Sequence, residues 1–404
     1  MFIVTGGAGF IGSAVVRALN HVGETDVLVV DDLRDARKVS NLAGLQIADY
    51  ADKDDFLRDV ERNGLPAGTQ VVFHQGANAD TTAEDGRAVM RENYSYSKTL
   101  LHAAVDARAA FVYASSAAVY GRSRHLLDRN EPNPLSPYAY SKYLLDVYAS
   151  RLAATAESAV VGLRYHNVYG PGEQHKDGMA SVALQFLRQA QNDGEIRVFG
   201  AADGYDAGEH RRDWVHVDDV AAVNLFFGFG PVRRGVFDVG TGTPGTFNDV
   251  AQLVAEHAST RGETPEIRYV DFPERLLPQY QPYTQADLSP LRAAGFRRPF
   301  TSLHQGVTAY LDHLTGCGPR AKAETPSFNP QSLTQMSTNK QKLDVDFCEL
   351  DVQEVEAYLQ EGGRGIGEYA ASCGTIKPQD AETTTIIQGS CSSRSSDQIV
   401  SDFD

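Results

Sequence analysis

The chain has 404 residues and a formal net charge of −16 at pH 7, from 53 acidic and 37 basic side chains. This charge argues against nucleic acid or an anionic membrane surface as partners. A hydrophobic fraction of 42% is ordinary for a soluble α/β protein, and the length allows about two domains. The chain starts on a strand pattern without an export signal, so we expect it to stay in the cytoplasm.

The first predicted elements are a buried strand at residues 2–5, a glycine turn, and a helix at residues 10–19. Gly6, Gly9 and Gly12 are spaced three apart across the turn. Such a turn suits a dinucleotide pyrophosphate, because free backbone N–H groups and the helix dipole point at it and glycines let the phosphates approach. The alternative is a glycine turn without a ligand.

A second predicted strand, residues 27–31, ends at Asp31, nineteen residues after Gly12. An acid at this place can accept a hydrogen bond from the adenosine ribose. Asp31 alone favours NAD, because its charge repels the 2′-phosphate of NADP. Lys38, with Arg34 and Arg37 close by in the sequence, can offset that repulsion.

Short apolar runs then alternate with helical patterns. Strands are expected at residues 70–74, 110–115 and 160–165, and helices at 96–107 and 138–154. This alternation predicts an α/β fold, a Rossmann-type doubly wound parallel sheet. After the strand at 70–74, the small residues up to Ala79 let the backbone pass close to a cofactor. The alternative there is a plain strand-to-helix turn.

From about Glu173 the pattern becomes irregular, which favours a smaller substrate-binding lobe with some segments returning to the sheet. Its expected strands are residues 196–199, 236–239 and 267–270, and its expected helices are 179–191 and 248–259, with a last helix ending near residue 314. We therefore divide the chain into an NAD(P)-binding domain at 1–170, the lobe at 171–315, and a linker with an acidic tail at 316–404.

The tail has a different composition from the rest of the chain. Residues 316–335 hold three prolines, as a linker does, and one acidic helix is expected at 351–360. All four cysteines lie after residue 315: Cys317, Cys348, Cys373 and Cys391. No pair of them has metal-ligand spacing, so no metal site is expected. We expect a disordered extension or a fused reading frame. The alternative is a faint similarity to the leader and core of a ribosomally made, modified peptide.

Candidate catalytic residues follow the strand at 110–115. Oxidising a sugar alcohol with a nicotinamide needs a base for the hydroxyl proton. Tyr138 and Lys142 share a helix face at i, i+4 spacing, so the ammonium can lower the pKa of the phenol and bind the nicotinamide ribose. Ser116, rather than Ser115, is expected to hydrogen-bond the reacting oxygen. The alternative for this tyrosine and lysine is chance spacing on a solvated helix.

Three motifs carry a family resemblance: TGGAGFIG, ASSAAVYG and the Tyr138/Lys142 pair. They resemble the extended short-chain dehydrogenase/reductase superfamily, whose members epimerise, dehydrate or reduce nucleotide sugars. Residues 1–314 are more closely similar to the ADP-L-glycero-D-manno-heptose 6-epimerase family, in segments such as YHNVYGPGEQHKDGMASVA and QYQPYTQADLSPLRAAGF.

This resemblance implies a cytoplasmic homo-oligomer that acts in lipopolysaccharide core biosynthesis. Bound NADP would take a hydride from C6 of an ADP-heptose, leaving a 6-keto sugar, and would return it to the opposite face. The second acid/base of the family matches Lys176. The alternative for Lys176 is a surface charge or a phosphate contact.

The resemblance also implies binding residues, position by position. For the cofactor, together with Gly6, Gly9 and Gly12 of the turn, these are Phe10, Ile11, Asp31, Asp32, Lys38, Lys53, Gln75, Gly76, Ala77, Asn78, Ala79, Asn93, Lys142, Val168 and Lys176. For the substrate they are Asn167, Gly178, Gln185, Phe199, Gly200, Ala201, Ala202, Arg212 and Tyr280. A guanidinium pairs two phosphate oxygens, which makes Arg212 the natural diphosphate ligand. The alternative is an ion pair with Asp213.

Several positions depart from the family pattern. Serine and histidine are usual where Gly178 and Gln185 stand, and an acid or asparagine where Gln75 and Asp32 stand. The loop at 202–210 is also several residues longer. These changes touch the nucleotide-sugar pocket.

Two other kinds of protein are alternatives to this interpretation. One is another member of the superfamily, such as a UDP-sugar 4-epimerase or a 4,6-dehydratase. A dehydratase needs an Asp-Glu pair after the serine, whereas Ala117 and Ala118 follow Ser116. The other is a non-catalytic nucleotide-binding protein, which the intact Ser116, Tyr138 and Lys142 disfavour.

Overall fold

The computed structural model describes residues 1–81, 83, 85–122 and 132–316. The chain divides into two compact units whose residues contact mainly one another, Met1–Asn339 and Lys340–Asp404. The second unit lies outside the described residues, as do residues 317–335 of the predicted linker, the acidic helix and the four cysteines. The division of the body at residue 170 stays a prediction.

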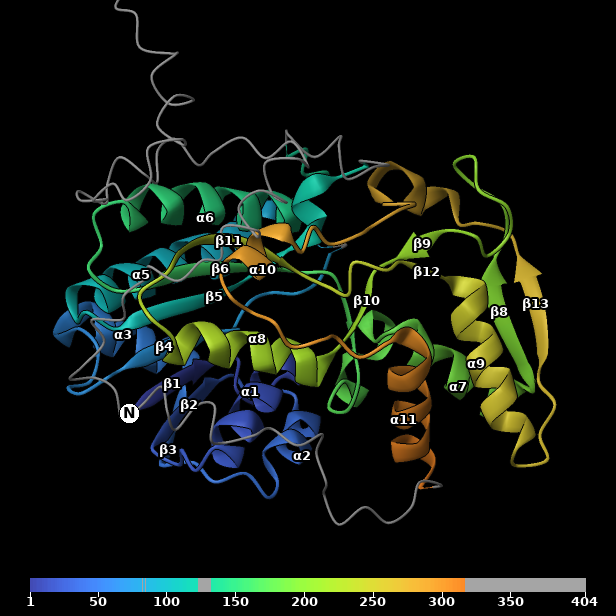
Figure 1. Ribbon diagram of the computed structural model, residues 1–404, viewed down its shortest axis with the longest axis horizontal. Coiled ribbons are helices and arrows are strands. Elements are labelled where there is room, and N and C mark those ends of the chain that lie inside the picture. The colour runs from blue at the N-terminus through green and yellow to red at the C-terminus, as the bar shows by residue number, and fades with distance from the viewer. Residues whose placement is uncertain (82, 84, 123–131, 317–404) are drawn as a thin grey trace, which may run out of the picture. The chain divides into compact units, whose positions relative to one another are not determined.

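A sheet of seven parallel strands forms the centre of the described body (Figure 1). The strand order is β11-β6-β5-β4-β1-β2-β3, which confirms the predicted doubly wound fold. The strands are β1 (Phe2–Thr5), β2 (Val27–Asp31), β3 (Asp49–Asp52), β4 (Val71–His74), β5 (Ala110–Ser116), β6 (Val160–Tyr165) and β11 (Arg234–Val239). β11 is the segment that returns from the lobe to the sheet. β3 was not predicted, because its sequence DYAD is polar and none of its residues is fully buried.

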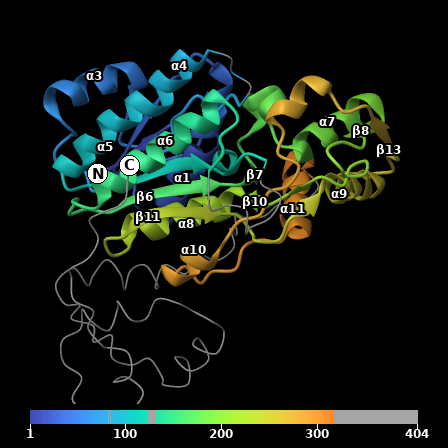
Figure 2. The ribbon, with the colours of Figure 1, turned by 90° about the horizontal axis from the view of Figure 1, so that it is seen from above.

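Helices cover both faces of this sheet (Figure 2). One face packs on α1 (Phe10–His21) and α8 (Val217–Phe229) through a cluster that includes Val15 and Val223. The other face packs on α3 (Lys53–Asn63), α5 (Tyr96–Asp106) and α6 (Pro137–Ala153), around Leu100 and Leu145. Apolar strands buried on both faces need such cover. Two short helices, α2 (Val39–Leu42) and α4 (Gly86–Met90), lie in the loops.

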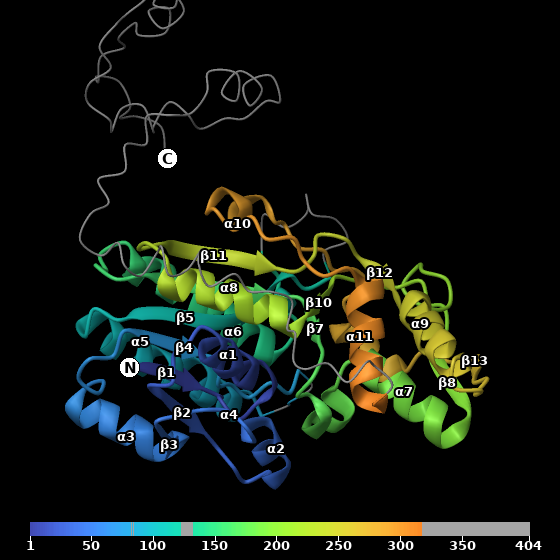
Figure 3. The same cartoon turned by 60° about the horizontal axis from the view of Figure 1, so that its bottom comes forward.

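The lobe has its own core around Phe186 and Trp214. It contains the parallel pair β8 (Glu195–Phe199) and β13 (Glu266–Val270), with helices α7 (Val182–Asp193), α9 (Phe247–Ser259) and α11 (Leu303–Thr315). Two short pairs lie outside the seven-stranded sheet: β7 (Asn167–Tyr169) with β10 (Trp214–His216), and β9 (Arg211–Arg212) with β12 (Gly245–Thr246). α10 (Ser289–Ala293) packs near β11, whose arrowhead points towards the lobe in Figure 3.

The predicted lobe therefore lies at the carboxyl ends of the parallel strands, where doubly wound folds bind their ligands. The order of the strands reverses between β1 and β4, which places the crevice beside these two. No helix of the described ranges is long and apolar enough to cross a bilayer.

Candidate active site

The glycine turn leaves no room for side chains at two of the three positions predicted from its spacing, Gly6 and Gly12. A Cβ on Gly12 would lie 2.0 Å from the Gly6 carbonyl oxygen, and one on Gly6 would lie 2.7 Å from the Gly76 nitrogen. Gly6 also has a φ of 65°, which L side chains rarely adopt. Gly9 is the N-cap residue of α1 and gives no side-chain hydrogen bond, so the first amides of the helix are open to an anion.

Asp31 is buried at the end of β2, beside this turn. Its Oδ2 accepts hydrogen bonds from the amides of Ala8 and Gly9, at 2.8 and 3.1 Å. Its Oδ1 lies 3.0 Å from the Lys38 ammonium, which also donates to the Asp32 carbonyl oxygen. The negative charge predicted at this place is thus compensated by the predicted lysine.

The two arginines near Lys38 have carboxylate partners of their own. Arg34 Nε donates to Asp32 at 2.6 Å, and this pairing lowers the pKa of Asp32 to about 2 despite partial burial. Arg37 forms a two-pronged ion pair with Asp177 at 2.6 and 2.9 Å, in addition to its contact with Asp35. The loop that follows β2 is therefore joined to the loop that carries Lys176.

The turn at 75–79 is hydrogen-bonded to the side chain of Asn93, which is fully buried. The Asn93 carboxamide accepts from the Asn78 amide at 2.7 Å and donates to the Asn78 carbonyl at 3.0 Å. It also donates to Ser141 on α6. The Gln75 side chain donates a hydrogen bond to Asn224 and accepts one from the Tyr165 hydroxyl. The predicted cofactor residue Asn93 is thus a support of the turn, with its polar atoms occupied by protein groups.

Ser116 and Tyr138 come together as predicted. The two hydroxyl groups are close enough to affect the pKa of the phenol, and Ser116 Oγ accepts a hydrogen bond from the Ala118 amide at 3.1 Å. Ser115 instead donates to the buried Asp146, which supports the choice of Ser116 for the site. Burial raises the pKa of Tyr138, and the nearby Ser116 hydroxyl opposes this effect. The pKa of Tyr138 is therefore raised in the described chain, and a lowering of it by Lys142 stays a prediction.

Lys142 lies near Tyr138 but is occupied elsewhere. Its ammonium is 5.9 Å from the Tyr138 ring centroid and donates to the Ala114 carbonyl at 2.8 Å. Burial lowers the pKa of Lys142 to about 8, against the opposing charge of Asp146. Asp146 in turn pairs with Arg164 at 2.8 Å. The ammonium is therefore held at the end of β5 by a buried network.

Lys176 lies beside the start of α1. Its ammonium is 5.5 Å from the ring centroid of Phe10, the first residue of that helix, and burial lowers its pKa. Glu173, which is fully buried, opposes the shift. This place fits the phosphate contact that was the alternative for Lys176, and the role of second base stays a prediction.

Arg212 is buried between two aromatic rings. Its guanidinium lies 4.8 Å from the Tyr280 ring centroid and 5.6 Å from that of Phe247. Burial lowers the pKa of Arg212, and the Tyr280 hydroxyl opposes this. The Asp213 carboxylate points elsewhere and accepts from the amides of Thr241 and Ala286. The alternative of an Arg212–Asp213 ion pair is therefore wrong, and no described carboxylate forms an ion pair with Arg212.

The family model for the NAD dependent epimerase/dehydratase family matches residues 2–233. The chain belongs to this family. It is 47% identical over 331 residues to the ADP-L-glycero-D-manno-heptose-6-epimerase of Alkalilimnicola ehrlichii, covering 82% of this chain and 100% of that protein. The predicted resemblance is confirmed, and the family, the fold and this relative make the chain an enzyme of the isomerase class.

Solved structures of other family members share the fold. The ADP-L-glycero-D-manno-heptose-6-epimerase of Helicobacter pylori is 30% identical, with a TM-score of 0.67 over 78% of this chain and 96% of that one. The UDP-glucose 4-epimerase of Thermus thermophilus, solved in complex with NAD, is 29% identical, with a TM-score of 0.64 over 78% and 99%. The family likeness therefore extends to enzymes named for different sugars.

The other substrate residues predicted for this epimerase-family chain lie along the lobe. Asn167 begins β7 and accepts a hydrogen bond from Thr284. Gln185 donates to the carbonyl oxygens of Gly178 and Ala180, so its amide secures the loop before α7. Phe199 ends β8 and packs on Phe272. The predicted substrate positions Gly200, Ala201 and Ala202 follow the carboxyl end of β8. Of the predicted cofactor positions, Lys53 begins α3 directly after β3, and Val168 is the middle residue of β7.

Several supporting residues were missed by the sequence analysis. His74 connects Thr5 of β1 to Ser97 of α5, and Gln281 donates to two carbonyl oxygens 160 and 164 residues away. Asp146 and Asp213 are buried acceptors. No local motif marks these residues, because each acts through partners that are distant in the sequence.

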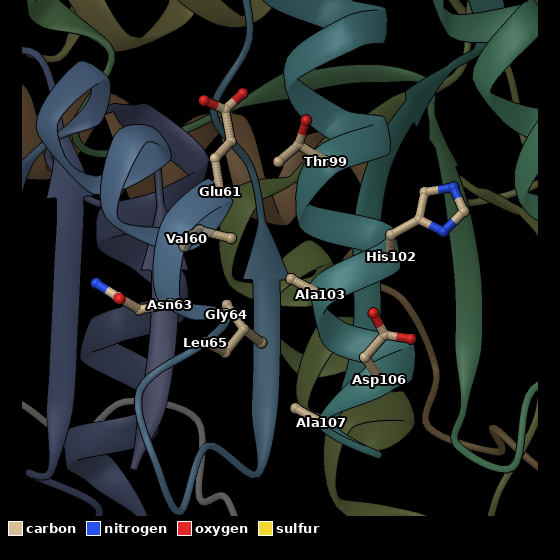
Figure 4. Close-up of a pocket in the computed structure, with 10 residues that line it drawn as sticks. All are labelled: Val60, Glu61, Asn63, Gly64, Leu65, Thr99, His102, Ala103, Asp106 and Ala107. Carbon is tan, nitrogen blue, oxygen red and sulfur yellow. The ribbon is translucent and has the colours of Figure 1, made fainter.

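A groove of about 670 Å³ lies apart from this site, between α3 and α5 (Figure 4). Its lining includes Glu61, His102 and Asp106. It lies toward the end of α5 that leads into β5, so it is at the amino ends of the strands. None of the predicted site residues lines it. Among the residues that the structure describes, no group of three His, Cys, Asp or Glu side chains could hold a metal ion.

Proposed function

We propose that this enzyme converts ADP-D-glycero-D-manno-heptose to ADP-L-glycero-D-manno-heptose by inverting C6 through a transient 6-keto sugar. The observation that carries the proposal is the 47% identity over the whole length of an enzyme named for this reaction. The hydroxyl groups of Ser116, at the carboxyl end of β5, and of Tyr138 lie close together, which supports it.

The residues at the glycine turn fit a nicotinamide dinucleotide. The turn excludes side chains at Gly6 and Gly12, the first amides of α1 have no side-chain cap, and Asp31 lies beside the turn. When bound, the nicotinamide would accept a hydride from the sugar and return it. Lys176, next to Phe10, would contact the cofactor with its ammonium.

In this proposal the protein's own groups move the proton. Tyr138 Oη takes the proton of the C6 hydroxyl, and Ser116 Oγ donates a hydrogen bond to the same sugar oxygen. The positive charge of Lys142 stabilises the phenolate. Tyr138 returns the proton after the ketone has presented its other face, or Lys176 does so if it is the second base.

The ADP part would bind in the lobe. Arg212 has the charge and the planar donor geometry to pair two diphosphate oxygens, and it has no carboxylate partner among the described residues. Tyr280, stacked on the guanidinium, would line the same site. An anion would thus compensate a charge that is otherwise buried alone.

For the cofactor we propose NADP. Lys38 compensates Asp31, and Arg34 is exposed enough to reach a 2′-phosphate. The cofactor released on denaturing the purified protein identifies it directly. Release of NAD would overturn this preference. Lys38→Ala is expected to weaken NADP about tenfold more than NAD, because an ion pair to the 2′-phosphate contributes on the order of 1 kcal/mol.

The test of function is incubation with a panel of nucleotide sugars, with the stereochemistry of the product read by NMR. Inversion of C6 in ADP-heptose is expected. Interconversion of UDP-glucose and UDP-galactose with ADP-heptose untouched would move the function to a UDP-sugar 4-epimerase, and turnover of no sugar would leave a nucleotide-binding protein. With this reaction we also propose that the enzyme self-associates, is located in the cytoplasm and acts in lipopolysaccharide core biosynthesis.

A further inference from the structure

One segment of the lobe, residues 277–287, joins the two halves of the site. The side chain of Gln281 donates from Nε2 to the carbonyl oxygens of Ala117 and Gly121, at 3.1 and 2.7 Å. Carbonyl oxygens only accept, so the nitrogen of the amide must face them. These two oxygens flank the short helix Ala117–Tyr120, which follows Ser116 directly.

Two further contacts bind the same segment to the same turn. Arg122 donates to the Leu277 carbonyl oxygen at 3.1 Å. The Tyr120 hydroxyl donates to Asp238 at 2.6 Å, and the other oxygen of that carboxylate accepts from the Asp287 amide at 3.0 Å. The turn after Ser116 is thus attached to residues 277–287 near both ends and in the middle.

The residue before Gln281 belongs to the candidate diphosphate site. Tyr280 stacks on the Arg212 guanidinium, with 4.8 Å between the guanidinium carbon and the ring centroid. Neighbouring side chains of one extended segment therefore contact the two parts of the site. One faces the cation that would bind the nucleotide, and the other faces the backbone that carries Ser116.

We propose that Gln281 is a positioning residue that couples occupancy of the Arg212–Tyr280 site to the placement of Ser116 against Tyr138. This inference rests on the proposed function, because it takes the Arg212–Tyr280 site to bind the nucleoside diphosphate. A diphosphate on Arg212 fixes Tyr280, so the amide of Gln281 keeps its two hydrogen bonds to the turn at 117–121 and Ser116 stays beside Tyr138. Specific binding of the nucleotide thus favours the reactive geometry.

The test uses the full chain with its cofactor, and ADP or UDP alone as the probe. Hydrogen–deuterium exchange at residues 117–121 is measured with and without each nucleotide in the wild type, Gln281→Ala, Gln281→Glu and Gln285→Ala. Gln285 is the matched control, because it lies in the same segment and donates to the Gly242 carbonyl at 2.9 Å instead of to the turn. A thermal melt of each variant establishes that it is folded.

In the wild type and Gln285→Ala, ADP is expected to slow exchange at 117–121 about tenfold, because fixing Tyr280 makes the two Gln281 hydrogen bonds open less often. In both Gln281 variants ADP should bind within about threefold of the wild-type Kd but give no slowing, and kcat should fall about tenfold with little change in KM. Slowing and kcat retained in Gln281→Ala and Gln281→Glu would overturn the inference.

Failure of the proposed function gives a different result. If UDP binds and ADP does not, the proposed substrate is wrong, and the same exchange measurement with UDP still decides whether Gln281 couples the two parts of the site. If neither nucleotide binds the wild type, Arg212 is not a diphosphate site and both proposals fall.

Discussion

The carboxylate of Asp213 faces away from Arg212, its neighbour in the chain. Asp213 is fully buried and accepts hydrogen bonds from Thr241, Gly242 and Ala286, whereas the Arg212 guanidinium lies between aromatic rings on the other side. Successive side chains of an extended strand point to opposite faces, so this separation is what β9 and its continuation dictate. The result is a buried cation that has no described carboxylate partner and lies beside Tyr280.

Replacing Arg212 by methionine should separate binding from stability. The variant should bind ADP about 10–100-fold more weakly, since charge-assisted hydrogen bonds contribute about 1.5–3 kcal/mol. Its melting temperature should not fall, because an apolar side chain of similar length replaces a charge that burial penalises. Titration calorimetry and thermal melts check both results. If the variant lost stability as well as ADP affinity, Arg212 would be a structural residue and not mainly a ligand for ADP.

Replacing Tyr138 by phenylalanine should remove catalysis and leave the fold intact. The loss of the acid/base should lower kcat by about 10²–10⁴-fold while bound cofactor is retained. Tyr140→Phe is the control, because Tyr140 is exposed and lies two residues away on another face of α6. Turnover of a sugar nucleotide is measured for both variants. Unchanged turnover in Tyr138→Phe would remove the proposed mechanism.

Lys142 should make stability depend on pH in the alkaline range. Its pKa is about 8 in the folded chain and 10.5 as the ordinary value, so between these values the unfolded chain binds more protons. Stability therefore rises with pH in this window, by about 2 kcal/mol from pH 8 to pH 10 relative to Lys142→Met. Urea unfolding of the cofactor-free protein measures the difference. Parallel pH curves for the two proteins would contradict the buried ammonium.

The sequence predicted those parts of the site that depend on local spacing. The glycine turn, Asp31, and the Tyr138/Lys142 pair are fixed by one strand, one turn or one helix face, and the structure places them accordingly. The raised pKa of Tyr138 and the partners of Arg37 depend on burial and on a loop 140 residues away. The contact of Gln281 with the turn after Ser116 spans the lobe and the sheet. Spacing contains no information on such contacts.

His74 provides a last prediction, because its hydrogen bonds fix its tautomer. Ser97 Oγ donates to the Asn93 carbonyl at 2.5 Å, so it accepts from His74 Nε2 at 2.7 Å. Nε2 therefore carries the proton, and Nδ1 accepts from the Thr5 hydroxyl, 2.6 Å away. This chain of bonds links β1 to the residue that supports the turn at 75–79.

Burial, with the nearby charge of Lys142, lowers the pKa of His74 to about 3, from an ordinary 6.5. Between these values the unfolded chain binds more protons, so acidification from pH 6.5 to 4.5 should cost the wild type about 2–3 kcal/mol at this residue. His74→Phe loses both hydrogen bonds, about 2 kcal/mol at pH 7, but lacks this acid sensitivity. Urea unfolding at pH 7 and 4.5 should therefore show the gap between the two proteins closing at pH 4.5. The control is His102→Phe, at an exposed histidine of α5, whose difference in unfolding free energy from the wild type should not shrink at pH 4.5. If that difference stayed constant for His74→Phe, His74 would take up a proton in the folded chain without loss of stability.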